Sequence, residues 1–285
     1  MATIQNKIVN KPYFRTVYLL LLAGLGCICC TTTPEKKTGS ESITTKDNDL
    51  KHMDYLYQYS IIDALLAGVY DGDLSVGQLR TKGSLGVGGF NHLDGELYMN
   101  EGEVYKIRYD GSVHKVPDAD RIPIAFVKHF QPDTTLTLVQ KGMDYEGFRA
   151  RLQSFLDQNE LYAIRISGSF PKVLARAPAP AEKPYPPLAE HLKEHQHGFG
   201  LKHTRGTGVG FYLPEYMGKV NIPGFHFHYL SEENRSGGHV LDFVADSLYV
   251  EIDRASGFVV QFPDNRSFRR ADLQKDREKE VEKIE

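Results

Sequence analysis

Apolar residues recur with a period of two along most of this chain, and this pattern constrains its fold more than any other feature. Short segments such as 161–170 and 247–252 alternate apolar and polar side chains, which is typical of strands with one buried face. Helical spacing is confined mainly to residues 55–68 and 144–159. Because strands mostly follow strands, we expect an α+β fold: two β-rich subdomains with mixed or antiparallel sheets and a few flanking helices.

Composition narrows the class of protein. Of the 285 residues, 41% are hydrophobic, and the formal net charge is -3. A mean hydropathy of -0.39 excludes a protein with many membrane spans. No nucleic-acid partner is expected, because neutralising phosphates requires an excess of basic residues.

All three cysteines fall in positions 27–30, so the rest of the chain has no disulfide and no cysteine-based metal site. Basic residues and an apolar run at 17–26 precede them, a pattern that predicts a signal peptide over residues 1–30. A glycine directly before Cys27 indicates lipoprotein processing with an acylated Cys27. We therefore expect an exported protein, periplasmic or anchored to the membrane by lipid.

The remaining chain divides by composition. Residues 31–52 are polar and predict a disordered tether. Residues 177–187 are rich in proline, which suits an extended strap between two parts. We expect an N-terminal α+β half at 53–176 and a C-terminal β-rich half with the metal site at 188–285, together forming one functional unit.

One strand carries the clearest chemical signal. His226 and His228 are separated by one residue, so they share one face of a strand, and aromatic side chains lie on the other face. A polar turn ending in two glycines leads to His239, which a hairpin would return beside them. Three neutral imidazoles match a catalytic zinc site with open positions. The alternative is a strand with two solvent-facing histidines.

From about residue 55 onward, the chain resembles bacterial α-acetolactate decarboxylases. The resemblance rests on Leu93-Asp-Gly-Glu96, Phe170-x-x-Val-x-x-Arg176, Pro223-Gly-Phe-His-Phe-His228 and Gly237-Gly-His-Val-Leu241, with further matches at 57–60, 68–73, 184–188 and 206–211. It implies that His226, His228 and His239 bind Zn²⁺, that Glu96 lies by the metal and that Arg176 faces the substrate. It also implies a homodimer.

A glutamate from the C-terminal tail also reaches the zinc in that family. Counting from the histidine pair gives Glu285, with Glu282 as the second choice. The proton donor stays open among Glu96, Glu285 and a metal-bound water. This chain has Gly89 where the family often has threonine, which puts its rate or stereocontrol in question.

The residues suit the implied reaction, decarboxylation of 2-acetolactate to acetoin and CO₂. Losing the carboxylate leaves two electrons that pass into the adjacent ketone, and a zinc ion stabilises the resulting enediolate as a Lewis acid. Arg176 offers planar donors to a carboxylate or an enediolate, and a buried carboxyl can supply the proton. No organic cofactor is expected.

Two other functions fit parts of the sequence. His226, His228 and Glu232 match the first metal motif of cupin barrels, which would make the chain a metal-dependent oxygenase with Glu232 as a ligand. An exported metal-binding lipoprotein without catalysis is the non-enzymatic alternative.

Overall fold

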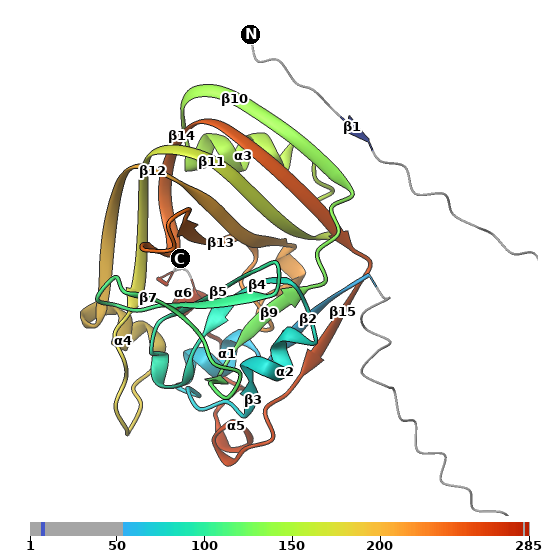
Figure 1. Cartoon of the computed structure of the whole chain (residues 1–285). Coiled ribbons are helices and arrows are strands. Elements are labelled where there is room, and N and C mark those ends of the chain that lie inside the picture. The colour runs from blue at the N-terminus through green and yellow to red at the C-terminus, as the bar shows by residue number, and fades with distance from the viewer. Residues whose placement is uncertain (1–6, 9–53, 282, 285) are drawn as a thin grey trace, which may run out of the picture.

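A seven-stranded mixed sheet forms one half of the molecule (Figure 1). The computed structural model describes residues 7–8, 54–281 and 283–284. The strand order is β15-β2-β9-β4-β5-β6-β7, antiparallel throughout except for the parallel pair β15–β2. Its strands are β2 (Tyr55–Tyr59), β4 (Leu85–Gly89), β5 (Glu96–Asn100), β6 (Glu103–Ile107), β7 (Val113–Lys115), β9 (Ala125–Lys128) and β15 (Gly257–Gln261).

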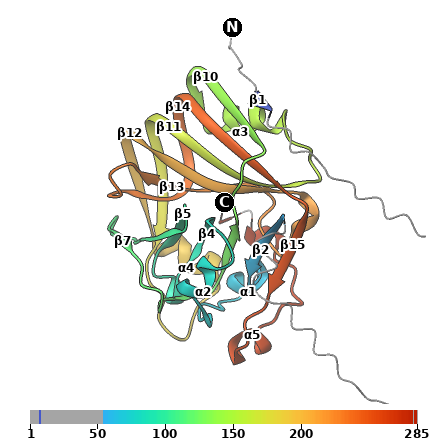
Figure 2. The ribbon, with the colours of Figure 1, turned by 45° about the vertical axis from the view of Figure 1, so that its right-hand side comes forward.

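A six-stranded antiparallel sheet forms the other half and arches over the first in both views (Figures 1 and 2). Its order is β1-β10-β14-β11-β12-β13, and β14 also pairs with β13. Strands β11 to β14 therefore close into a ring. The strands are β1 (Lys7–Ile8), β10 (Thr134–Asp144), β11 (Leu161–Pro178), β12 (Gln196–Leu213), β13 (Gly224–Ser231) and β14 (Gly237–Ala255).

Helices are short and flank the sheets. In α3 the Asp144 side chain accepts a hydrogen bond from the Gly147 N–H at 2.8 Å, which caps the first turn. The helices are α1 (Ile62–Leu66), α2 (Val76–Arg80), α3 (Tyr145–Gln153), α4 (Leu188–Glu194), α5 (Arg266–Arg270) and α6 (Glu278–Val281), and the two-stranded pair β3 (Leu74–Ser75) and β8 (Arg121–Ile122) lies apart.

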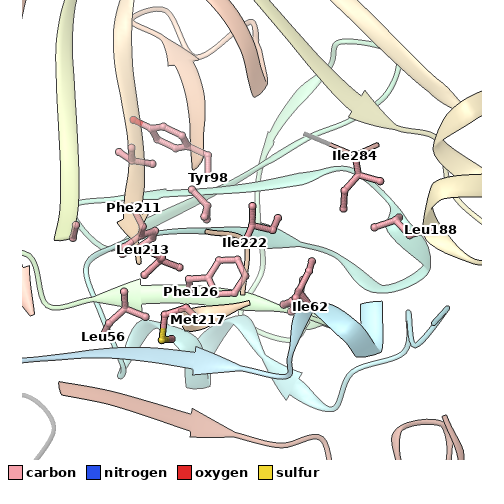
Figure 3. Packing of buried hydrophobic residues seen from close by; sticks show 14 of the residues in the cluster. Leu56, Ile62, Tyr98, Phe126, Leu188, Phe211, Leu213, Met217, Ile222 and Ile284 are labelled. Atoms are coloured by element: carbon pink, nitrogen blue, oxygen red, sulfur yellow. The ribbon is translucent and has the colours of Figure 1, made fainter. Parts of the chain in front are cut away.

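Apolar side chains on the strands form three hydrophobic clusters in the described residues, and β11 contributes to two of them. At the start of β11, Leu161 and Ala163 join the cluster between the two sheets, and Ile164 joins a cluster with α3. Figure 3 shows part of the cluster between the sheets, with Ile284 from the C-terminal tail beside Leu188. The predicted α+β class with mixed and antiparallel sheets is confirmed.

The helix predicted over 55–68 is wrong in its first part. Residues Tyr55–Tyr59 form β2, and α1 covers only Ile62–Leu66. Four of the five β2 residues are buried because the strand is covered on both faces, so its sequence lacks the period of two. Gly68 does end this region, with φ +88°.

The two sheets also differ from the predicted halves. Strand β15 follows β14 in sequence but pairs with β2 in the sheet built mostly from residues 55–128, while β10 and β11 join the later strands. The chain therefore crosses between the sheets more than once. The predicted signal peptide and tether, residues 1–30 and 31–52, lie outside the described residues except for β1. Among the described residues, no helix has the length and apolarity to cross a bilayer.

Candidate active site

The hairpin of β13 and β14 brings the three histidines together. His226 and His228 share a face of β13, and His228 is the direct cross-strand partner of His239. One ring nitrogen from each of the three side chains lies within 4.8 Å of the corresponding nitrogens of the other two. The Nε2 atom of His226 is 3.2 Å from His228 Nε2 and 3.2 Å from His239 Nδ1. Three nitrogen lone pairs can therefore point at one centre.

Two glycines allow the strands to approach this closely. A Cβ on Gly237 would lie 2.1 Å from the Tyr229 carbonyl oxygen, and one on Gly238 would lie 2.5 Å from the Arg176 carbonyl oxygen. Gly238 also has φ +143°, a conformation that L side chains rarely adopt. The Gly-Gly-His sequence is thus a requirement of backbone packing as well as of ligand placement.

Desolvation keeps the three histidines neutral, and a hydrogen bond orients His228 for metal binding. The Nδ1–H of His228 donates to the Leu97 carbonyl at 2.7 Å, which leaves the Nε2 lone pair toward the cluster. Burial lowers the pKa of all three, that of His228 to about 4, and the positive charge of Arg176 acts in the same direction. The imidazoles are therefore neutral near pH 7.

Glu96 approaches from the facing sheet, at the start of β5. Its Oε2 atom is 3.5 Å from His228 Nε2. The turn before it depends on Gly95, which has φ +97° and where a Cβ would lie 2.5 Å from the Ile107 carbonyl oxygen. The site thus lies between the two sheets, with the imidazoles on one side and a carboxylate on the other.

Arg176 extends the histidine row along the six-stranded sheet. It is the cross-strand partner of His239 on β14, and only 8% of its surface is exposed. Its Nη1 donates to Gln196 Oε1 at 3.1 Å, and its Nη2 donates to the Ile284 carbonyl. Gln196 and Ile284 were not predicted as site residues from the sequence. For Ile284 the available signal was an apolar residue in a charged tail.

A cavity of about 80 Å³ connects these groups. The three histidines, Glu96 and Arg176 form its polar part, and Gly89 also borders it. The other walls are largely apolar and come from distant segments; they include Ile62, Leu93, Phe126, Leu188, Ile222 and Ile284. Such a cavity can hold a small polar ligand while excluding most water.

Comparison with known proteins agrees with this geometry. The model of a protein family described as alpha-acetolactate decarboxylase matches residues 56–275. The chain belongs to this family. Named members of the family are decarboxylases, and the chain is an enzyme of the carboxy-lyase class. Membership favours an enzyme over the non-catalytic metal-binding alternative.

Relatives in this family match over most of their length. Alpha-acetolactate decarboxylase of Brevibacillus brevis is 36% identical over 90% of each chain. The enzyme of the same name from Methanosarcina mazei is 38% identical over 89% of each. The crystal structure of alpha-acetolactate decarboxylase from Bacillus subtilis strain 168 has a TM-score of 0.77 and 37% identity, covering 81% of this chain and 97% of that one. The fold is therefore that of the family.

Three predicted residues remain to be considered, namely Glu232, Glu282 and Glu285. Glu285 and Glu282 lie outside the described residues, although the neighbouring Ile284 reaches the cavity. Glu232 pairs instead with Arg205 at 3.2 Å, and its side chain is 65% exposed. Glu232 is not among the residues lining the cavity, so the cupin-type ligand set does not form.

Proposed function

We propose that this chain converts 2-acetolactate to acetoin and CO₂ at a zinc ion held by His226, His228 and His239. The convergence of three neutral imidazoles, two of them buried and that of His226 partly buried, carries the proposal. Arg176 and Glu96 border the same cavity, and the relatives of the chain are named alpha-acetolactate decarboxylase.

The donor set fits zinc. Catalytic zinc sites use three protein ligands and keep a position for water or substrate, and imidazole nitrogen is a preferred ligand. The Leu97 carbonyl orients His228 as ligating histidines are usually oriented, through the nitrogen that does not bind metal. When bound, Zn²⁺ supplies Lewis-acid polarisation of substrate oxygens.

The other polar side chains have separate proposed roles, which are to bind the substrate carboxylate and to supply a proton. Acetolactate is a 2-hydroxy-3-oxo acid, and its carboxylate matches the planar guanidinium of Arg176. Gln196 holds the Nη1 edge of that guanidinium. We propose Glu96, which borders the cavity, as the group that delivers a proton to the carbon that loses CO₂, with Glu285, next to Ile284 in the sequence, as the second candidate for this role.

Product analysis tests this function. Purified protein with zinc should release acetoin and CO₂ in equal amounts from racemic acetolactate, faster than the spontaneous reaction under the same conditions. The Glu232→Gln variant should keep this activity, since Glu232 lies outside the cavity. Loss of activity in Glu232→Gln would favour the cupin-type alternative, and absence of acetoin from folded, zinc-loaded wild type would refute the decarboxylase.

We infer further that the chain is exported and acylated at Cys27. The basic residues, apolar run and following cysteine support this inference. Metabolic labelling with palmitate should mark the wild-type chain and leave Cys27→Ser unlabelled. Equal labelling of both would contradict acylation at this residue.

We also infer a homodimer, from the family resemblance alone. Light scattering of the purified protein should give twice the chain mass of 32.2 kDa. A mass of one chain at micromolar concentration would contradict a dimer.

A further inference from the structure

Backbone strain precedes Glu96 and has no role in the mechanism above. His92 has φ +64° and Leu93 has φ +57°, and Gly95 follows with φ +97°. Only glycine adopts this region without cost, so the conformation of His92 and Leu93 must be imposed by surrounding contacts. Such strain tends to occur where a protein must aim a side chain.

Those contacts come from two distant segments. The His92 N–H donates to the Tyr70 carbonyl at 3.0 Å, and the His92 carbonyl accepts from the Ala181 N–H at 2.6 Å. Ala181 belongs to the proline-rich strap at 177–187. The backbone of His92 is thereby held on both sides.

The His92 side chain adds a second attachment to the strap. The Tyr185 hydroxyl donates to Asp71 Oδ1 at 2.8 Å, so its oxygen is left to accept from His92 Nδ1, which it contacts directly. Lys183 completes the group with an ion pair to Asp71 Oδ2 at 2.6 Å. We name Asp71, His92, Lys183 and Tyr185 the strap latch.

His92 of the strap latch lies directly before the residues that face the metal site. Leu93 is buried and borders the cavity. Three residues later Glu96 approaches His228, and the Leu97 carbonyl accepts from the same imidazole. A shift at His92 would therefore be passed to the carboxylate and to one histidine together.

We propose that His92 is a positioning residue, whose attachment to Tyr185 and Asp71 holds the left-handed turn that aims Glu96 at the metal site. The inference rests on the proposed function for its effect on turnover. His92 should also affect how firmly zinc is retained, because the Leu97 carbonyl orients His228.

A double-mutant cycle tests the effect on turnover. His92→Ala leaves a residue that also disfavours positive φ and removes the side-chain attachment that holds it there, so kcat should fall about tenfold with KM within about twofold. In the Glu96→Gln background, His92→Ala should cause little further loss, because it acts through Glu96. Tyr185→Phe, which removes one hydroxyl and keeps the ring, should show a smaller loss of the same kind.

His203→Ala is the matched control. His203 is also an exposed histidine with left-handed φ, +50°, but it lies on β12 away from the strap latch. It should leave kcat unchanged. Wild-type kcat in both His92→Ala and Tyr185→Phe, or losses that add fully to that of Glu96→Gln, would overturn the proposal.

Zinc release distinguishes this proposal from the proposed function. In excess chelator, zinc should leave His92→Ala several times faster than it leaves wild type or His203→Ala, whether or not acetolactate is the substrate. Faster release with no turnover in wild type would refute the decarboxylase and retain the strap latch. Equal release from all three proteins would count against the strap latch even in an active enzyme.

Discussion

The histidines and Glu96 approach one cavity from two sheets that place their side chains in different ways. On the histidine side, His226, His228 and His239 stand on two paired strands, and the pairing alone brings them together. On the Glu96 side, the carboxylate follows a turn with positive φ at His92, Leu93 and Gly95. That turn depends on contacts with a strap far along the chain.

This difference predicts how each side of the site responds to amino-acid substitution. A side chain on a paired strand is held by many backbone hydrogen bonds, so changing one neighbour moves it little. A side chain after a strained turn is held by a few specific contacts. We therefore expect ligand loss to cause the largest effects on the histidine side, and remote substitutions to act mainly on the Glu96 side.

Removing a histidine should have the largest effect. His226→Ala should lose bound zinc and at least about a thousandfold in kcat/KM, because two imidazoles leave too few ligands. Metal analysis and initial rates measure this. Retention of one zinc per chain with activity within about tenfold of wild type would show that His226 is not a ligand.

Acid should destabilise the zinc-free protein. Burial lowers the pKa of the three histidines in the folded chain, that of His228 to about 4. The unfolded chain therefore binds more protons, and stability is fully present above about pH 6.5 and falls toward pH 4. For His228 alone the loss is on the order of 3 kcal/mol.

Urea unfolding of the zinc-free protein between pH 7 and pH 4.5 measures this loss. The His228→Gln variant should show a shallower dependence, because it lacks one of the groups that titrate. Identical slopes in the two proteins would contradict the assigned shift.

Arg176 lies on the histidine side but is held by Gln196 and the tail. Arg176→Gln should lower kcat/KM about a hundredfold, since it removes the charge that we propose binds the substrate carboxylate. Lys172→Gln, on the same strand but exposed and paired with Asp242, is the control. Equal activities of these two variants would remove Arg176 from the reaction.

Substitution of Gly238 tests whether the close approach of the β14 and β11 backbones is needed to hold the histidines. Gly238→Ala should destabilise the protein by about 2 kcal/mol and weaken zinc binding, because its Cβ would lie 2.5 Å from the Arg176 carbonyl oxygen. Gly200→Ala should be neutral, since a Cβ there meets nothing within 4 Å. Thermal unfolding with and without zinc separates the two effects. A Gly238→Ala protein as stable as wild type would contradict the packing account.

Gly89, on the Glu96 side, should give the smallest effect. A Cβ there would have its nearest neighbour, the Gly95 carbonyl oxygen, 3.8 Å away. Gly89→Thr should therefore change stability by less than about 0.5 kcal/mol. Steady-state rates on each acetolactate enantiomer would show whether the hydroxyl adds to rate or stereocontrol. A large loss of stability would mean that this part of the cavity is tighter than the 3.8 Å contact implies.

The three histidines could be predicted from the sequence, whereas the residues that hold Arg176 and Glu96 in place could not. The period of two placed His226 and His228 on one face, and the two glycines indicated the return to His239, because both signals are local. The roles of Gln196, Ile284 and His92 depend on contacts between segments far apart in sequence, which no local pattern records. Tyr55–Tyr59 was predicted as a helix because a strand buried on both faces shows no alternation.

Removal and return of the metal test the central claim most directly, namely that the three histidines hold the zinc ion that drives decarboxylation. Acetoin formation should stop when a chelator strips the full-length protein and should return as zinc is titrated back, with the endpoint at one zinc per chain. The His239→Ala protein should not recover. Full activity in protein shown to be free of metal, or recovery in His239→Ala equal to that of wild type, would contradict the account.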